Sequence, residues 1–138
     1  GGGIYTSAAE AAAKVGGKLI GVDVDQSANI NTYGEGMCVT SAMKGLAETV
    51  KHMLSEVVAG NFANYGGKIE TLGLVSGDDP TANYVQLPME TTQWGDGFTQ
   101  DDYKALVKAM YDGEVTVSND ISAMPATTIT VNFAGNIK

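Results

Sequence analysis

The sequence predicts an α/β fold, and three observations lead to that class. An apolar run over residues 18–25 is bounded by glycines and polar residues, which is typical of a strand buried on both faces of a parallel sheet. Apolar residues recur every three or four positions over residues 42–58, as in an amphipathic helix. Predicted strands and helices alternate along the chain, which favours α/β over all-α or all-β architectures.

The first predicted helix follows a glycine-rich entry at residues 1–5. Ser7 and Glu10 have the spacing of a capping box, and the pair Gly16 and Gly17 ends the helix. Glycines ahead of a helix N-terminus let backbone N–H groups face an anion or a hydroxyl. A close-packed turn is the alternative explanation for the same glycines.

The remaining elements follow in order. After the strand at 18–25 we expect a short strand at 37–41 that runs directly into the long helix, which Gly60 closes. Thr99 and Asp102 cap a last helix through Tyr111, with Leu106, Val107 and Met110 on its apolar face. The segment 75–98 is predicted to be an irregular loop, and loops of that length are often functional. Further strands are predicted at residues 68–74, 115–117 and 128–133.

Composition narrows the functional classes. The chain has 138 residues, enough for one domain, and a net charge of −8, which argues against nucleic-acid binding. One cysteine, Cys38, excludes an internal disulfide and a cysteine-based metal site, and no cofactor is predicted. No apolar stretch has the length of a membrane span. Because the sequence starts at Gly1 without a methionine, we expect a mature or truncated product whose export signal or lipid anchor would lie upstream.

Candidate functional residues lie where the first two strands end. Asp23 and Asp25 close the first strand, and ligands of open α/β sheets bind beyond the carboxyl ends of strands. Lys44 is predicted in the first turn of the long helix, where a cation opposes the helix dipole. It therefore needs a nearby carboxylate or a ligand hydroxyl, unless it is simply a solvated lysine.

Other chemically capable residues have simpler explanations. His52 is the only histidine and lies within the long helix without a positioned partner, so no catalytic triad is predicted. Cys38 is typical of a small core residue. The aromatic residues Tyr84, Trp94 and Phe98 could stack on a flat ligand or pin the long loop to the body of the protein.

One enzymatic hypothesis rests on the acidic residues. Asp23-Val24-Asp25-Gln26-Ser27 after an apolar strand resembles the first motif of haloacid-dehalogenase-type phosphatases, and Gly77-Asp78-Asp79 resembles their late acidic motif. That resemblance implies Asp23 as nucleophile, Asp25 as acid/base and Asp78 or Asp79 as a magnesium ligand. The segment that precedes the strand does not belong to this pattern.

A longer part of the chain resembles the basic membrane protein family, the substrate-binding lipoproteins of ABC importers that include purine-nucleoside receptors. The similarity follows the same order and spacing over most of the chain. It comprises the glycine pair with Glu10-Ala11-Ala12, residues 16–26, Val39-Thr40-Ser41-Ala42-Met43-Lys44, the helix ending at Val58-Ala59-Gly60-Asn61-Phe62, residues 66–74, and Tyr111-Asp112-Gly113-Glu114-Val115.

The resemblance implies a type I periplasmic-binding fold with a mostly parallel sheet flanked by helices. Because such a fold needs over twice this length, the chain is expected to be its C-terminal portion, a partial fold without the N-terminal half. About 1–36 would belong to the ligand-binding lobe and 37–138 would form hinge-crossing and returning segments. The implied protein is extracytoplasmic, is held at the membrane by an N-terminal lipid, and delivers a nucleoside or simple sugar to an ABC permease without catalysis.

The family's ligand-binding positions fall on four residues of this chain. An aspartate and a lysine that hold ribose hydroxyls correspond to Asp23 and Lys44, and a glycine pair near the ligand corresponds to Gly2 and Gly3; Asp25 is a further candidate from its place at the strand end. The chain departs from the family pattern directly after the glycines, at Ile4-Tyr5, and again after residue 74. A sensory ligand-binding domain of a regulator would use the same fold and remains the alternative.

Overall fold

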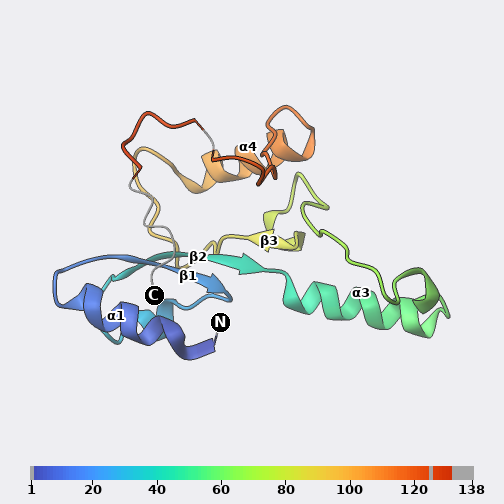
Figure 1. Cartoon of the computed structure of the whole chain (residues 1–138), viewed down its shortest axis with the longest axis horizontal. Coiled ribbons are helices and arrows are strands. Elements are labelled where there is room, and N and C mark those ends of the chain that lie inside the picture. The colour runs from blue at the N-terminus through green and yellow to red at the C-terminus, as the bar shows by residue number, and fades with distance from the viewer. Residues whose placement is uncertain (1, 125, 132–138) are drawn as a thin grey trace.

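The computed structural model describes residues 2–124 and 126–131, and it is a small α/β fold built on a three-stranded mixed sheet (Figure 1). The strands lie in the order β1 (Leu19–Asp23), β2 (Cys38–Lys44) and β3 (Val85–Gln86). The helices are α1 (Tyr5–Ala13), α2 (Ser27–Ile30), α3 (Leu46–Val58) and α4 (Gln100–Tyr111), with 3-10 turns at Gly2–Ile4, Phe62–Asn64 and Pro80–Ala82. The predicted α/β class is therefore confirmed.

Strands β1 and β2 run parallel, and their ends coincide. Their connection, residues 24–37, contains α2 and has the length that a parallel crossover requires. The register pairs Asp23 with Met43, so Lys44 follows one residue beyond the end of β1. β3 runs antiparallel to β2 and pairs Val85 with Lys44. This topology brings the last residues of β1 and β2 to the same edge of the sheet.

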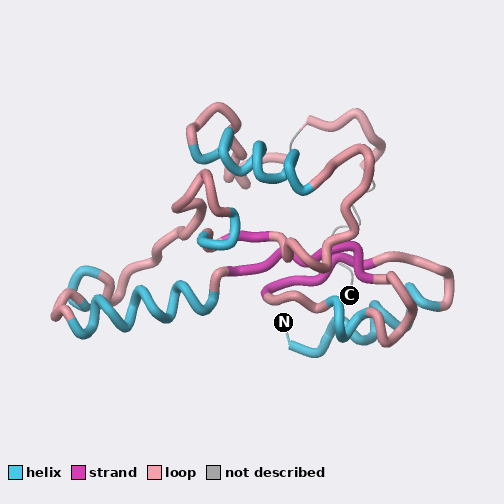
Figure 2. The backbone as a smooth tube through the Cα atoms, turned by 180° about the vertical axis from the view of Figure 1, so that it is seen from behind, coloured by secondary structure: helices cyan, strands magenta, loops and turns pink. Residues whose placement is uncertain are grey.

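The packed core lies on one side of the sheet. Ala9 of α1, Ile30 of α2, Met37 and Cys38 are buried together, with Tyr5, Ala12, Leu19 and Tyr33 against them. Cys38 is therefore a core residue, the role expected of it. Helix α4 lies on the opposite side of the strands from α1, as both views of the chain show (Figures 1 and 2).

Some predicted strands are not formed. Residues 68–74 and 115–117 are irregular, and so are 128–131, whereas 132–133 lie outside the described residues. The alternating pattern of 68–74 fits a strand, but Ile69 is fully exposed. The Gly73 carbonyl accepts one hydrogen bond from a distant part of the chain, from Tyr84 N–H at 3.1 Å. A strand needs a ladder of such bonds, which the pattern alone does not provide. The third strand comes instead from the predicted loop 75–98, as β3.

Helix boundaries follow local physics. The predicted Ser7–Glu10 capping box is wrong, because the turn Gly2–Ile4 leads straight into α1 and Ser7 is already inside the helix. The Thr99–Asp102 capping box of α4 is confirmed, and α4 ends at Tyr111 as predicted. Across the described ranges, no helix combines the length and apolarity needed to cross a membrane.

Helix α3 begins later than predicted because β2 continues through Lys44. At the junction between β2 and α3, a Cβ on Gly45 would lie 2.8 Å from the Asn83 carbonyl oxygen, so only glycine fits at this position. Helix α3 then extends away from the sheet (Figure 1), and none of its residues is buried. Its apolar stripe is exposed, including Val50 at 58% and Leu54 at 60%.

Candidate functional site

The ends of β1 and β2 carry an ion pair. The Lys44 Nζ lies 2.7 Å from Asp23 Oδ1, and the two side chains are 61% and 42% exposed. Within the described residues the Oδ1 atom is shielded from water, and its only polar contact is the ion pair with the Lys44 ammonium. Within the described residues no hydrogen bond reaches the other oxygen, Oδ2, which leaves it available to an incoming hydroxyl group. Asp23 and Lys44, two of the four residues that the family resemblance assigns to ligand binding, are thus brought together.

The backbone at Asp23 adopts an unusual conformation. Its φ is +70°, and within the described part of the chain it is the only non-glycine residue with positive φ. The Val24 N–H donates to the Val22 carbonyl at 2.9 Å, which closes a tight three-residue turn around Asp23. Such turns are rare and strained, and strained backbone is concentrated at functional sites. The turn ends β1 and directs the aspartate side chain toward Lys44.

The turn is supported by Gln26 and Ser41, neither of which was predicted to have this role. Gln26 Oε1 accepts a hydrogen bond from Val22 N–H at 2.9 Å, and Gln26 N–H donates to Ser41 Oγ at 3.1 Å. Ser41 is fully buried. A Cβ on Gly21 would overlap Ser41 Oγ and lie 2.9 Å from Gln26 Cβ, so glycine is required beside this support. The only sequence signal for this role was the amide that follows the strand.

Lys44 affects the charge state of Asp23. The hydrogen-bonding contact with Lys44, and then its positive charge, lower the pKa of the Asp23 carboxyl below its ordinary value. Asp23 is therefore a carboxylate at neutral pH and acts as a hydrogen-bond acceptor. Lys44 supplies donors beside it, so the pair presents an acceptor and donors to a ligand that carries adjacent hydroxyl groups.

Asp25 has a different role from Asp23. Its Oδ1 accepts from Ser27 N–H at 2.9 Å, and its Oδ2 accepts from Thr91 Oγ1 at 2.7 Å. Burial raises the pKa of Asp25, but the hydrogen bonds from Ser27 and Thr91 outweigh that effect and the pKa is lowered overall. Both oxygens thus tie the start of α2 to the segment before α4. Asp25 organises the loop that follows β1 by these contacts.

The other acidic residues of the phosphatase hypothesis are not brought to this site. Asp79 accepts from the Thr81 N–H at 2.9 Å and caps the turn Pro80–Ala82. Among residues 2–124 and 126–131, no three histidine, cysteine, aspartate or glutamate side chains gather so as to hold a metal ion. The structure therefore separates Asp23 and Asp25 in role and does not join Asp78 or Asp79 to them.

The predicted glycines lie at the start of α1. Gly2 and Gly3 belong to the turn Gly2–Ile4, and a Cβ at Gly3 would meet no other atom within 4 Å. Gly3 therefore does not lie in a close-packed turn, because the space around it is open.

Lys44 lies in the last position of β2 rather than in the first turn of α3, which corrects the predicted element. Its side chain borders three hollows of the surface. Of the loop aromatics, Trp94 pins the loop to α4: its indole N–H donates to the Met89 carbonyl at 2.9 Å, and its ring centroid lies 5.6 Å from that of Tyr103. His52 packs edge-on against Tyr65 at 5.6 Å between ring centroids.

A buried asparagine organises the segment that leads to β3. Asn83 is fully buried; its Oδ1 accepts from the N–H groups of Val75 and Ser76 at 2.7 and 2.8 Å, and its Nδ2 donates to the Ser76 carbonyl at 3.0 Å. These bonds close the loop beside the strand that pairs with Lys44. No sequence pattern had indicated this role.

Comparisons with known proteins give no relative to set beside this geometry: no family model matches the chain, and neither a curated protein nor a solved structure does.

Proposed function

We propose that the chain is the C-terminal portion of an extracytoplasmic solute-binding lipoprotein, with the type I periplasmic-binding fold. It binds a nucleoside or simple sugar without catalysis and delivers it to an ABC permease. A lipid at the N-terminus of the whole protein would hold it at the cell membrane. A sensory domain of a regulator would use the same residues for binding and would differ in the domains to which it is joined.

The observation that carries this proposal is the Asp23–Lys44 pair at the ends of two parallel strands. The carboxyl edge of a parallel sheet is where α/β proteins bind small molecules. The pair lies at that edge, it is half-exposed, and the aspartate is held in a strained turn. A carboxylate beside an ammonium suits the adjacent hydroxyl groups of a sugar ring, since one accepts and the other donates.

The large exposed surface of the chain supports the proposal of a second lobe. The chain exposes 10044 Å², whereas a compact monomer of its mass, 14.3 kDa, exposes about 6,800 Å². Helix α3, with its apolar stripe uncovered, accounts for part of this excess. A partner lobe supplied by the missing N-terminal half, or by a second chain, would cover such a surface.

Thermal shift of the full-length protein with nucleosides and simple sugars tests the proposal. A ligand at 100 times its Kd stabilises by about 2.7 kcal/mol, which is readily detected. Asp23→Ala should abolish the shift while the fold stays intact. Asp101→Ala is the matched control, because it removes an exposed aspartate whose ion pair with Lys104 lies within α4, and it should leave the shift unchanged.

Two results would contradict the proposal. One is a calorimetric affinity that is the same in Asp23→Ala as in the wild type. The other is magnesium-dependent release of phosphate that is lost in Asp23→Asn, which would assign the chain to the phosphatases instead.

A further inference from the structure

One side of α3 is apolar and uncovered. Its apolar stripe consists of side chains at every third or fourth position, which share one side of a helix: Leu46, Val50, Leu54 and Val57. Their exposed fractions run from 49% to 60%. The opposite side of α3 is where His52 contacts Tyr65 of the following loop. Since a helix with an apolar side is stabilised by packing that side against another element, the stripe is a surface for a partner.

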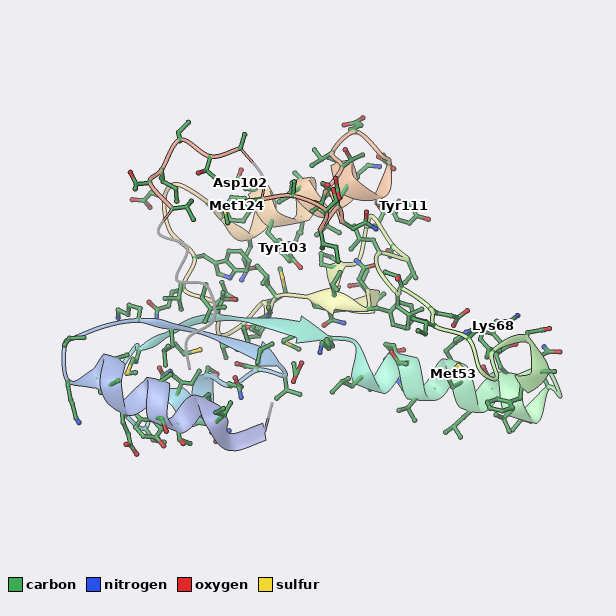
Figure 3. All side chains as sticks on the ribbon, in the orientation of Figure 1. Met53, Lys68, Asp102, Tyr103, Tyr111 and Met124 are labelled. Atoms are coloured by element: carbon green, nitrogen blue, oxygen red, sulfur yellow. The ribbon has the colours of Figure 1, made fainter. Side chains whose placement is uncertain are left out.

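A hollow of about 490 Å³ lies between the open face of the sheet and α4. Its lining is mainly apolar and includes half-exposed side chains of the strands and of α4, among them Val22, Val85 and Leu106. Tyr103 extends from α4 toward the strands (Figure 3), and its hydroxyl accepts from Leu87 N–H at 3.0 Å, which ties α4 to the segment after β3. The hollow is therefore a second apolar surface, with two walls that are joined to each other.

Neither the stripe nor the hollow brings an unpaired charge to a contact. Among the described residues that line the hollow, Lys44 alone is charged, and its ammonium is paired with Asp23. On α3, Lys51 is paired with Glu48 at 2.8 Å. Because burial of an unpaired charge would oppose docking, the two surfaces can cover each other with a gain from apolar contact and no such penalty.

The stripe lies away from the hollow of its own chain. Helix α3 leaves the sheet at Gly45, whose N–H donates to the Tyr84 carbonyl at 2.8 Å, so the start of the helix is fixed beside β3. Its 13 residues then carry the last turn about 20 Å beyond that point, in the direction away from the sheet (Figure 1). A second copy of the chain supplies both surfaces at once.

We propose that the protein forms a two-fold dimer in which the α3 stripe of each copy lies in the hollow between the sheet and α4 of the other. Two-fold symmetry makes both contacts together, since each copy gives one helix and one hollow. The chain exposes 10044 Å², about 3,200 Å² more than a compact monomer of its mass. A stable dimer covers about 800 Å² on each partner, so the excess is sufficient for the two contacts.

The inference goes beyond the proposed function and does not depend on it. The described lining of the hollow does not include Asp23, and the dimer forms without a ligand. The dimer is therefore tested by the mass of the protein in solution, whereas the proposed function is tested by ligand binding.

Paired substitutions of the full-length protein test the dimer by sedimentation equilibrium. Leu54→Glu places a charge in the stripe, and Ser55→Glu places the same charge at an exposed neighbouring position on the opposite side of α3. Leu106→Glu and Ala105→Glu make the same comparison on α4, where Ala105 is exposed and is not among the described lining residues. Each pair of variants has the same net charge, so only the position of the charge differs.

We expect a wild type of twice the mass of one chain. Each dimer has two copies of the leucine contact, and burial of one leucine contributes at least about tenfold in affinity, so Leu54→Glu and Leu106→Glu should each raise the dissociation constant by about a hundredfold. Ser55→Glu and Ala105→Glu should leave it unchanged. If Leu106→Glu does not fold by circular dichroism, Leu106→Ser, a smaller change at the same position, should still weaken the dimer by about tenfold.

Three results would overturn the dimer and leave the proposed function standing. A monomeric wild type would mean that another part of the same polypeptide covers α3. A dimer that Leu54→Glu weakens and Leu106→Glu does not would pair α3 with α3 of the second copy, without the hollow. A dimer that neither substitution weakens would use a different surface. Conversely, a dimer with the expected response that binds no nucleoside or sugar would overturn the proposed function alone.

Discussion

Asn83→Ala should destabilise the protein by about 3 kcal/mol. The substitution removes three hydrogen bonds of a fully buried side chain, two from the N–H groups of Val75 and Ser76 and one to the Ser76 carbonyl. Each such bond contributes about 1 kcal/mol net, and unsatisfied backbone groups cost at least as much. Since a chain of this size has a total stability of about 7–20 kcal/mol, the loss is a large fraction of it.

Urea unfolding measures the effect. With a slope of about 1–3 kcal/mol per molar urea, the midpoint should fall by about 1–3 M while the slope stays constant. Asn64→Ala is the control, because Asn64 is exposed and its side chain forms no hydrogen bond in the described part of the chain. A midpoint for Asn83→Ala that matches the control would refute the assignment of Asn83 as the residue that holds this loop.

Three further substitutions test other parts of the structure. Gly45→Ala should lower Tm through its clash with the Asn83 carbonyl, whereas Gly95→Ala, which meets open space, should not. The side-chain and backbone hydrogen bonds from Thr99 lower the pKa of the Asp102 carboxyl. The ionised Asp102 therefore stabilises the fold above the ordinary aspartate pKa, and this stabilisation is lost as the pH falls through the lowered pKa. Asp102→Asn should accordingly lower Tm at pH 7 but not at about pH 2. Asp23→Gly should have a higher Tm than Asp23→Asn, because glycine adopts a positive φ without strain. A higher Tm for Asp23→Asn would contradict backbone strain at this position.

Sequence patterns predicted best the elements whose signals are local. The capping residues of α4 depend on neighbours within a few positions and agree with the structure, and the strand predicted at residues 18–25 is formed over Leu19–Asp23. The failed strand at 68–74 had an equally good local pattern, but a strand exists only when a distant segment supplies a hydrogen-bonding partner. β2 pairs instead with β3, which consists of two residues in a segment predicted to be irregular.

The candidate site was predictable in part for the same reason. Asp23 could be found because acidic residues at a strand end are visible in the sequence, and Lys44 because its position opposed the predicted helix dipole. The support from Gln26 and Ser41 could not be predicted, because the two residues are 15 positions apart and meet only when β1 and β2 pair. The positive φ of Asp23 was likewise hidden, since only a small fraction of aspartates adopt positive φ and no neighbouring residue marks the ones that do.

The Asp23–Lys44 pair differs from the other ion pairs in a way that bears on its role. Among residues 2–124 and 126–131, the other ion pairs join residues three or four positions apart on α3 or at α4, where helix geometry brings neighbours together: Lys51–Glu48, Lys104–Asp101 and Lys108–Asp112. Asp23 and Lys44 meet across two strands, and Asp23 reaches its place through a backbone conformation that glycine would adopt with less strain. An exposed ion pair adds little stability, so stability does not account for an aspartate there. The proposed ligand, whose hydroxyl groups need a carboxylate at this end of the sheet, would account for it.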